Sequence, residues 1–171
     1  MTSPDSVTLV RATQADALLL ENLLSLYLHD LSAIYPMEPN PDGRFVYDRL
    51  PLYWTEPDRR RAYLIESEDR VAGFALTSRG SPATDDPEDL DTSEFFILRA
   101  DRRSGIGKQA AHRLWDEQPG RWVVRVPEVN RAGSPFWRET VSGYTGGDFS
   151  VGEWSGRPER WAVYTFASRS S

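Results

Sequence analysis

A strand that runs into a glycine-containing turn and then into a helix constrains this chain more than any other feature of its sequence. Residues 94–99 are too apolar for the edge of a sheet, and the turn 102–108, which contains two glycines, follows them. A helix over 105–117 and a second buried strand over 122–126 come next. This order predicts a βαβ unit, in which two parallel strands flank one helix.

The other expected elements make the sheet mostly antiparallel. They are a strand over 7–12, a helix that Thr13 caps, a hairpin over 62–66 and 71–77, a helix over 130–141 and a hairpin over 152–154 and 161–166. Prolines interrupt residues 35–61, where one short helix near 45–50 is expected. The predicted fold class is α/β (α+β), with about seven strands flanked by helices in one domain over 1–171.

Composition excludes several classes of function. The net charge of −6 argues against a broad nucleic-acid-binding face. Cysteine is absent, which rules out disulfides, thiolate metal sites and a cysteine nucleophile. His29 and His112 are single and far apart, so no metal site is expected, and His112 is expected in packing or at the surface. Without an apolar run long enough for a membrane or a leader at the start, the expected location is the cytoplasm.

The turn Arg102–Lys108 has the features of an anion site. Gly105 and Gly107 allow a sharp bend and leave room for a phosphate to approach the backbone. The first amides of the following helix have no partner within the helix, and the helix dipole adds partial positive charge there. Arg102, Arg103 and Lys108 add full charges at the same point. The turn therefore suits a pyrophosphate.

Other interpretations of the turn compete with this one. An ordinary tight turn with surface cations is the simplest. A Walker loop is excluded, because Arg102 stands where its first glycine belongs and no Ser or Thr follows Lys108. Residues 105–110 match G-x-G-x-x-A, with Glu128 about 20 residues further on, as in dinucleotide-binding proteins. That fingerprint belongs to the first unit of a long parallel sheet, whereas here an antiparallel segment comes first.

The segment from Phe95 to Gly107 resembles the central motif of the GNAT superfamily of N-acetyltransferases, which is Arg/Gln-x-x-Gly-x-Gly/Ala after a buried strand. Asn130, the pair Phe136-Trp137 and Gly143-Tyr144 are similar to a later segment of that family. The order of elements agrees over essentially the whole chain. The resemblance implies a GNAT-like fold with a splay between the fourth and fifth strands, and acetyl-CoA as co-substrate.

The resemblance also implies which residues hold that co-substrate. The backbone of Ile97, Leu98 and Arg99 would pair with the pantetheine arm like an added strand. Asn130, Phe136 and Trp137 would lie along its far side. The pyrophosphate would be held by the turn, whose residues are Arg102, Arg103, Ser104, Gly105, Ile106, Gly107 and Lys108.

Transfer from a thioester to an amine needs a base for the ammonium and an acid for the departing thiolate. Glu94 is the candidate base, because it opens the strand that leads to the turn and shares a face with Phe96. An equal alternative is a strand-end charge facing solvent. Trp137 replaces the family's usual tyrosine and cannot donate to a thiolate, so the candidate acid is Tyr144, another tyrosine or solvent. Tyr144 is equally a candidate for a buried packing residue. A strand-end amide near Ile97 is the candidate donor to the carbonyl oxygen.

The acceptor is expected to be a small-molecule or peptide amine. Its pocket or the core would take the aromatic residues of the proline-rich segment, which are Tyr35, Phe45, Tyr47, Tyr53 and Trp54. The acidic loop over 79–92 is expected to be solvated and mobile, with attraction of a cationic acceptor as the alternative. The terminal hairpin, with exposed tryptophans, is the expected contact of a homodimer. A non-catalytic acyl-CoA-binding domain is the alternative to an enzyme.

Overall fold

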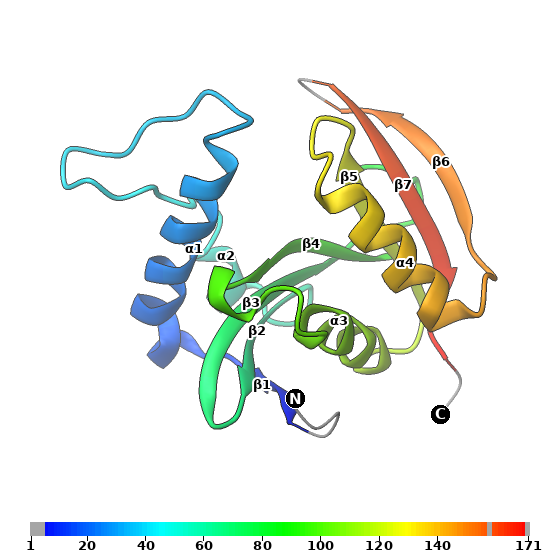
Figure 1. Cartoon of the computed structure of the whole chain (residues 1–171), viewed down its shortest axis with the longest axis horizontal. Helices are drawn as coiled ribbons and strands as arrows, with labels where there is room; N and C mark the ends of the chain where they lie inside the picture. The colour runs from blue at the N-terminus through cyan, green and yellow to red at the C-terminus, as the bar shows by residue number, and fades with distance from the viewer. Residues whose placement is uncertain (1–5, 157–158, 170–171) are drawn as a thin grey trace.

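The computed structural model describes residues 6–156 and 159–169. One mixed sheet has the strand order β1-β2-β3-β4-β5-β7-β6, with helices on both of its faces (Figure 1). The strands are β1 (Val7–Arg11), β2 (Arg60–Ser67), β3 (Arg70–Arg79), β4 (Leu90–Ile97), β5 (Arg121–Pro127), β6 (Ser150–Ser155) and β7 (Arg160–Ala167). The helices are α1 (Ala17–Leu31), α2 (Leu52–Thr55), α3 (Ile106–Asp116) and α4 (Gly133–Thr145), with 3-10 turns at Gln14–Asp16 and Arg99–Asp101.

The first four strands form an antiparallel unit that the sequence predicted. The turn between β2 and β3 consists of Glu68 and Asp69, with φ of 52° and 59°. Two consecutive residues with positive φ are the mark of a tight hairpin turn whose twist matches that of the strands. The predicted hairpin is therefore confirmed, and β3 then pairs with β4 along its length.

The β4–β5 pair is parallel and short. Its register covers three positions, from Leu90 beside Trp122 to Thr92 beside Val124. Beyond them β4 continues to Ile97 and β5 to Pro127 without pairing to each other. The expected splay between the fourth and fifth strands is confirmed.

A bulge in β4 decides which side chains face which helices. Leu76 of β3 lies beside Glu94 while Thr77 lies beside Thr92, so Ser93 is an extra residue in β4. Thr92 faces α3, because its hydroxyl accepts a hydrogen bond from Trp115. Without the bulge, alternation would turn Glu94 to that face as well. With it, Ser93 and Glu94 both lie on the face that α1 covers.

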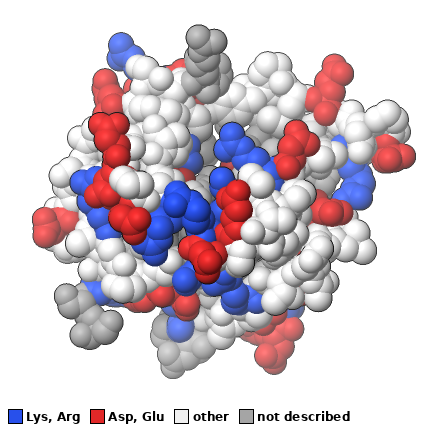
Figure 2. Space-filling model, turned by 180° about the vertical axis from the view of Figure 1, so that it is seen from behind, with Lys and Arg blue, Asp and Glu red and all other residues white. Residues whose placement is uncertain are grey.

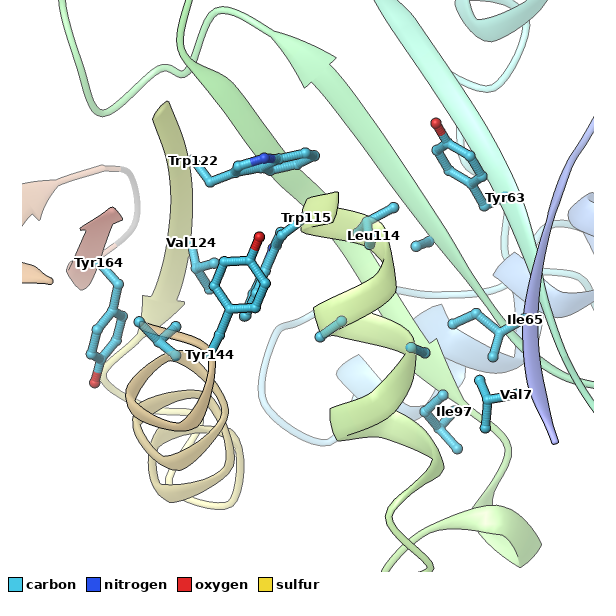
Figure 3. Close-up of a cluster of buried hydrophobic side chains, with 14 of the residues drawn as sticks. Val7, Tyr63, Ile65, Ile97, Leu114, Trp115, Trp122, Val124, Tyr144 and Tyr164 are labelled. Atoms are coloured by element: carbon cyan, nitrogen blue, oxygen red, sulfur yellow. The ribbon is translucent and has the colours of Figure 1, made fainter. Parts of the chain in front are cut away.

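Two hydrophobic clusters hold the helices against the two faces. Under α1 and α2, Leu20 and Leu24 pack against Phe74, Leu76 and Phe96 of the sheet. The other face carries α3 and α4, with a larger cluster that contains Trp115, Trp122, Val124 and Tyr144 (Figure 3). Burial of these side chains is the main stabilising contribution on each face.

Several expected boundaries were wrong. The short helix is α2, which begins after Pro51 and not near 45–50. The fourth strand begins at Leu90, so the loop before it is shorter than expected, and Arg99 lies in a 3-10 turn. Within that loop Asp85, Asp86 and Glu88 are exposed as expected, whereas Asp89 and Asp91 are buried.

The tryptophans of the terminal hairpin are half-buried, in contrast to the prediction that they are exposed. Trp154 and Trp161 pack with ring centroids 5.9 Å apart and planes tilted by 53°, and the guanidinium of Arg125 lies 5.8 Å from the Trp161 centroid. Their rings thus cover an arginine of β5. The homodimer that they suggested stays a prediction.

Candidate active site

The turn before α3 presents unpaired backbone donors. Within residues 6–156 and 159–169, the N–H groups of residues 103–108 have no hydrogen-bond partner. Gly105 stands at the N-cap of α3 with a φ of 86°, which glycine adopts without strain. A Cβ at Gly105 would meet only the Gln109 amide nitrogen, 3.8 Å away, so the approach to these amides is open. The geometry suits a phosphate group at the helix start.

The cations of the turn are arranged differently from the sequence prediction. The Arg102 guanidinium donates to the Ile97 carbonyl at 2.8 Å and to Asp30 of α1 at 2.6 Å. Lys108 extends along α4, where its Cε lies 3.1 Å from the position of a Cβ at Gly143. Arg103 is exposed at the bend, with a φ of 61°. The amides, with Arg103 beside them, are therefore the main attraction for an anion.

Gly107 and Gly105 have different roles. A Cβ at Gly107 would lie 3.2 Å from the ring of Phe136 in α4 and 3.5 Å from Ile97 Cγ1. Gly107 therefore allows α4 to pack closely on α3, and a side chain there would displace Phe136 before it met a ligand. These contacts give Gly107 a packing role, and the expectation that it keeps a path open for phosphate stays a prediction.

The end of β4 carries backbone groups that β5 leaves unpaired. The Leu98 amide donates to Ala72 of β3 at 2.8 Å. Because the direction of backbone groups alternates along a strand, those of Phe95 and Ile97 point toward β5, which does not pair with them. The Ile97 carbonyl accepts from Arg102, and Arg99 pairs with Asp30 at 2.7 Å. Of the three residues that were expected to pair with the pantetheine arm, Ile97 has backbone groups that point into the gap between β4 and β5.

The start of α4 lies across from this edge. The side-chain oxygen of Asn130 accepts a hydrogen bond at 3.0 Å from the amide of Gly133, the first residue of α4. Phe136 and Trp137 both pack against Phe95 of β4, with centroids 6.3 and 5.1 Å away. Aromatic side chains thus line the α3–α4 side of the diverging strands.

Glu94 lies on the opposite face, in the bulge of β4. Its carboxylate accepts hydrogen bonds from Tyr27 of α1 at 2.5 Å and from Tyr47 at 3.2 Å. Burial raises the pKa of Glu94 more than these two hydrogen bonds and the nearby Arg125 lower it. Burial also raises the pKa of Tyr27 well above its usual value, so this hydroxyl keeps its proton.

A pocket of about 240 Å³ opens beside Glu94. The side chains around it come from α2 and the segment before it, the start of β2, the end of β3, the first part of β4, and β5. They include Tyr47, Tyr53, Ser78, Asp91, Ser93, Glu94 and Arg125. The sequence allowed the aromatic residues to line a pocket or to belong to the core. Tyr47 and Tyr53 line the pocket, and Tyr53 is also a core residue.

Tyr144 makes no contact with Glu94 or with the pocket beside it. Its hydroxyl donates to Asp116 at 2.8 Å and accepts from the Arg169 amide at 2.9 Å. Asp116 ends α3, at the end of the sheet where β4 and β5 are paired. The ring lies in the α3–α4 core beside Trp115 (Figure 3). These contacts match the packing interpretation and leave Tyr144 without a path to a thiolate near Ile97.

His112 is also a packing residue. Its Nε2 lies 2.9 Å from the Thr140 carbonyl, and its ring contacts Trp115 and Tyr144. Burial lowers the pKa of His112. In the described part of the chain, no three histidine or acidic side chains come together as metal ligands would, and no helix has the length and hydrophobicity that crossing a membrane requires.

Tyr27 and Asp91 were not predicted as parts of this site. Tyr27 was not singled out in the sequence, and Asp91 lay in a loop that was expected to be solvated. Asp91 forms a two-point ion pair with Arg125 of β5, at 2.9 and 2.7 Å. The signal that could have identified both is polarity within a buried pattern: a tyrosine on an apolar helix stripe and a charge in a strand.

Comparison with known proteins supports the architecture. No family model matches the sequence, and no curated protein does. An acetyltransferase from Thermus thermophilus is similar at a TM-score of 0.65 and 24% identity, over 95% of this chain and 97% of that one. Spermidine N-acetyltransferase from Vibrio cholerae, solved with CoA and spermine, is similar at 0.64 and 12%, over 95% and 96%.

A third similar structure carries the name of the superfamily. It is a Desulfovibrio desulfuricans protein assigned to the GNAT family of acetyltransferases, with a TM-score of 0.60 and 15% identity over 96% of this chain and all of that one. Among the described strands only β4 and β5 are parallel, so the long parallel sheet of a dinucleotide-binding domain is not formed. The element order, the splay and the structural neighbours together show that this chain has the GNAT acetyltransferase fold.

Proposed function

We propose that this chain is an acetyl-CoA-dependent N-acetyltransferase that acts on a primary amine by direct attack. The observation that carries the proposal is the position of Glu94, whose carboxylate borders a pocket on the α1 face of two diverging strands. The unpaired amides of residues 103–108 lie where the longer of these strands leads into α3. Donors for a diphosphate and a base for an amine thus flank one opening in the sheet.

The residues that would hold acetyl-CoA are the amides of the turn, the backbone of Ile97 and the aromatic side chains at the start of α4. When bound, the co-substrate supplies an acetyl group on a thioester. Glu94 takes a proton from the acceptor's ammonium and leaves a neutral amine. The amine nitrogen then bonds to the acetyl carbon, the carbon–sulfur bond breaks, the sulfur leaves as thiolate, and the new amide nitrogen loses its extra proton.

The raised pKa of Glu94 suits this role. An ammonium with a pKa near roughly 10.4 gives up its proton more readily to a base whose own pKa is raised. The hydroxyls of Tyr27 and Tyr47 hold the carboxylate in one orientation. Solvent is the proposed proton source for the thiolate, because Trp137 and Tyr144 offer none there.

A non-catalytic acyl-CoA-binding domain is the second candidate. Trp137 favours it, because a ring N–H is not an acid. Acetyl transfer from acetyl-CoA to a panel of primary amines, followed by CoA release and by the mass of the product, separates the two. Binding of CoA without any acetylated product would favour the second candidate.

Gly105→Asp and Gly105→Asn are matched variants for the CoA site. Both side chains tolerate positive φ, and both meet the same open space, but only Asp places a negative charge beside the turn amides. We expect CoA affinity at least about tenfold lower in Gly105→Asp than in Gly105→Asn, with similar stability, in calorimetric titrations. Equal affinity in the two variants would contradict the location of the diphosphate.

A further inference from the structure

The pocket beside Glu94 is unusually rich in arginine for a chain of net charge −6. Two carboxylates, Asp91 and Glu94, line it together with five guanidinium groups. The five belong to Arg49, Arg59, Arg60, Arg79 and Arg125. Basic side chains also gather, with acidic ones among them, across the middle of the face opposite to that of Figure 1 (Figure 2).

Three of these arginines already have carboxylate partners. Arg125 pairs with Asp91, Arg60 with Glu56 and Arg79 with Glu88. Arg59 and Arg49 differ from them. The Arg59 guanidinium donates to the backbone carbonyl of Arg79 at 3.2 Å, and the Arg49 guanidinium has no ion pair or hydrogen bond with any residue that the structure describes. Both are exposed, so two guanidinium groups at the rim lack a compensating anion.

The negative and positive groups of the pocket therefore lie in different places. Glu94 is half-buried and is held by two tyrosines, whereas Arg49 and Arg59 are exposed. An ammonium is attracted to Glu94. A carboxylate or phosphate is attracted to Arg49 and Arg59, because the guanidinium group can donate two parallel hydrogen bonds to such an anion. A polyamine, in contrast, would bring several positive charges against the arginines.

The size of the pocket limits the ligand further. Its volume of about 240 Å³ is below the range of roughly 300–1,000 Å³ that is usual for drug-sized ligands. A small metabolite fits this volume. A folded protein surface would not enter it.

From this arrangement we infer that the acceptor is a small amine that also carries a carboxylate or a phosphate, with its amine at Glu94 and its anionic group at Arg49 and Arg59. The inference rests on the proposed function, because it assigns that reaction's acceptor. It makes this chain different in specificity from the similar spermidine N-acetyltransferase, whose named substrate is a polycation.

Matched pairs of amines test the inference. An α-amino acid is compared with the same amine without its carboxylate, an amino-sugar phosphate with the free amino sugar, and spermidine serves as the polycation. We expect kcat/KM at least about tenfold higher for the anionic member of one pair, which also tells carboxylate from phosphate. Spermidine as the best acceptor, or equal values within both pairs, would overturn the inference while leaving the acetyltransferase intact.

Variants of the pocket test whether Arg49 and Arg59 cause the preference for the anionic amine. Arg49→Gln and Arg59→Gln should each lower kcat/KM for the anionic member about tenfold, mainly through KM, and so reduce the difference within the pair. Arg113→Gln is the matched control, because Arg113 is exposed on α3 and lines no part of this pocket. An unchanged preference in both pocket variants would overturn the inference.

A binding measurement keeps the inference separate from catalysis. Calorimetry on the free protein should detect the anionic amine, with an affinity about tenfold lower in Arg49→Gln and unchanged in Arg113→Gln. This result without any acetylation would support the pocket and reject only the proposed enzyme activity. Absence of both binding and transfer for every anionic amine would overturn the inference.

Discussion

Glu94 shows how burial and hydrogen bonding compete at one carboxyl group. Its two tyrosine donors stabilise the charged form, and desolvation opposes them with the larger effect, so the pKa is raised. The folded protein therefore binds a proton at Glu94 more readily than the unfolded chain does. The charged form lowers stability as pH rises through the unfolded pKa, and this cost is complete above the folded pKa.

We predict that Glu94→Gln lowers turnover by roughly 10²- to 10⁴-fold while CoA affinity stays the same. In the unmodified protein kcat/KM should fall with decreasing pH through an apparent pKa above the usual carboxyl value, and the variant should lose this step. The pH profile of acetyl transfer is the measurement. Glu66→Gln, in β2, is the control.

The same variant also separates catalysis from folding. Because Gln avoids the cost of the buried charge, it should be at least as stable as Glu94 at neutral pH. Unchanged turnover together with normal stability would remove Glu94 from the reaction.

Sequence analysis could identify Glu94 but not its surroundings. A charge at the start of an apolar strand is visible in the residue pattern. Which face it takes is not, because the bulge at Ser93 depends on the register between β3 and β4. Tyr27 is 67 positions away in the sequence, and only the packing of α1 on the sheet brings it to the carboxylate.

At the scale of elements, two ion pairs connect β5 with β4 and with the residue just before β4, at the end where these strands are paired. Asp89 binds Arg121 through two contacts of 2.6 Å, and Asp91 binds Arg125 further along the same two strands. Asp91 has 1% of its side chain exposed and Arg125 has 15%. The strands diverge just beyond, so these pairs mark the closed end of the splay.

We predict that Arg125→Met destabilises the protein by about 3–5 kcal/mol, because it leaves Asp91 charged and buried with only the hydroxyls of Ser81 and Ser93 and no cation beside it. Combining it with Asp91→Leu should recover most of this loss. Chemical denaturation of the single and double variants measures the difference. Arg44→Met is the surface control, since Arg44 and Glu21 are 42% and 47% exposed and their pair contributes about 0–1 kcal/mol.

A loss of unfolding free energy in Arg125→Met no larger than that in Arg44→Met would show that the buried pair does not hold the strands together.

The ion pairs also explain why the prediction of a solvated acidic loop was partly wrong. A run of acids is usually solvated. Asp89 and Asp91 are neutralised by arginines 32 and 34 positions later, which composition does not reveal.

At the scale of the molecule, hydrophobic pattern was sufficient to place most of the strands along the chain, whereas the splay came from the family resemblance. The structure contains the strands that the sequence pattern predicted. Alternation predicted the strand over 7–12, the polar turn at Glu68 and Asp69 predicted the hairpin, and buried runs predicted β4 and β5. The proline-rich segment before β2 was the exception, because its turns follow tertiary packing and have no period. The direction of the cations in the turn also depended on a partner, Asp30, that lies 72 positions before Arg102.

The whole molecule should respond to its co-substrate. Because only the folded chain forms the turn and the splay, CoA at about 100 times its Kd should add roughly 2.7 kcal/mol of stability. For a domain of this size that corresponds to a Tm increase of about 5–10 °C. Differential scanning calorimetry measures it, with NAD as the control ligand. A shift with NAD and none with CoA would contradict the proposed co-substrate.

Asp30, near the end of α1, holds two arginines at the start of the turn before α3. Its carboxylate takes both Arg99 and Arg102, which flank the start of the turn, and it belongs to the same helix as Tyr27. If Arg102 turns toward a diphosphate at the proposed site, Asp30 keeps only its ion pair with Arg99, and the last turn of α1 loses one of the two ion pairs that fix it.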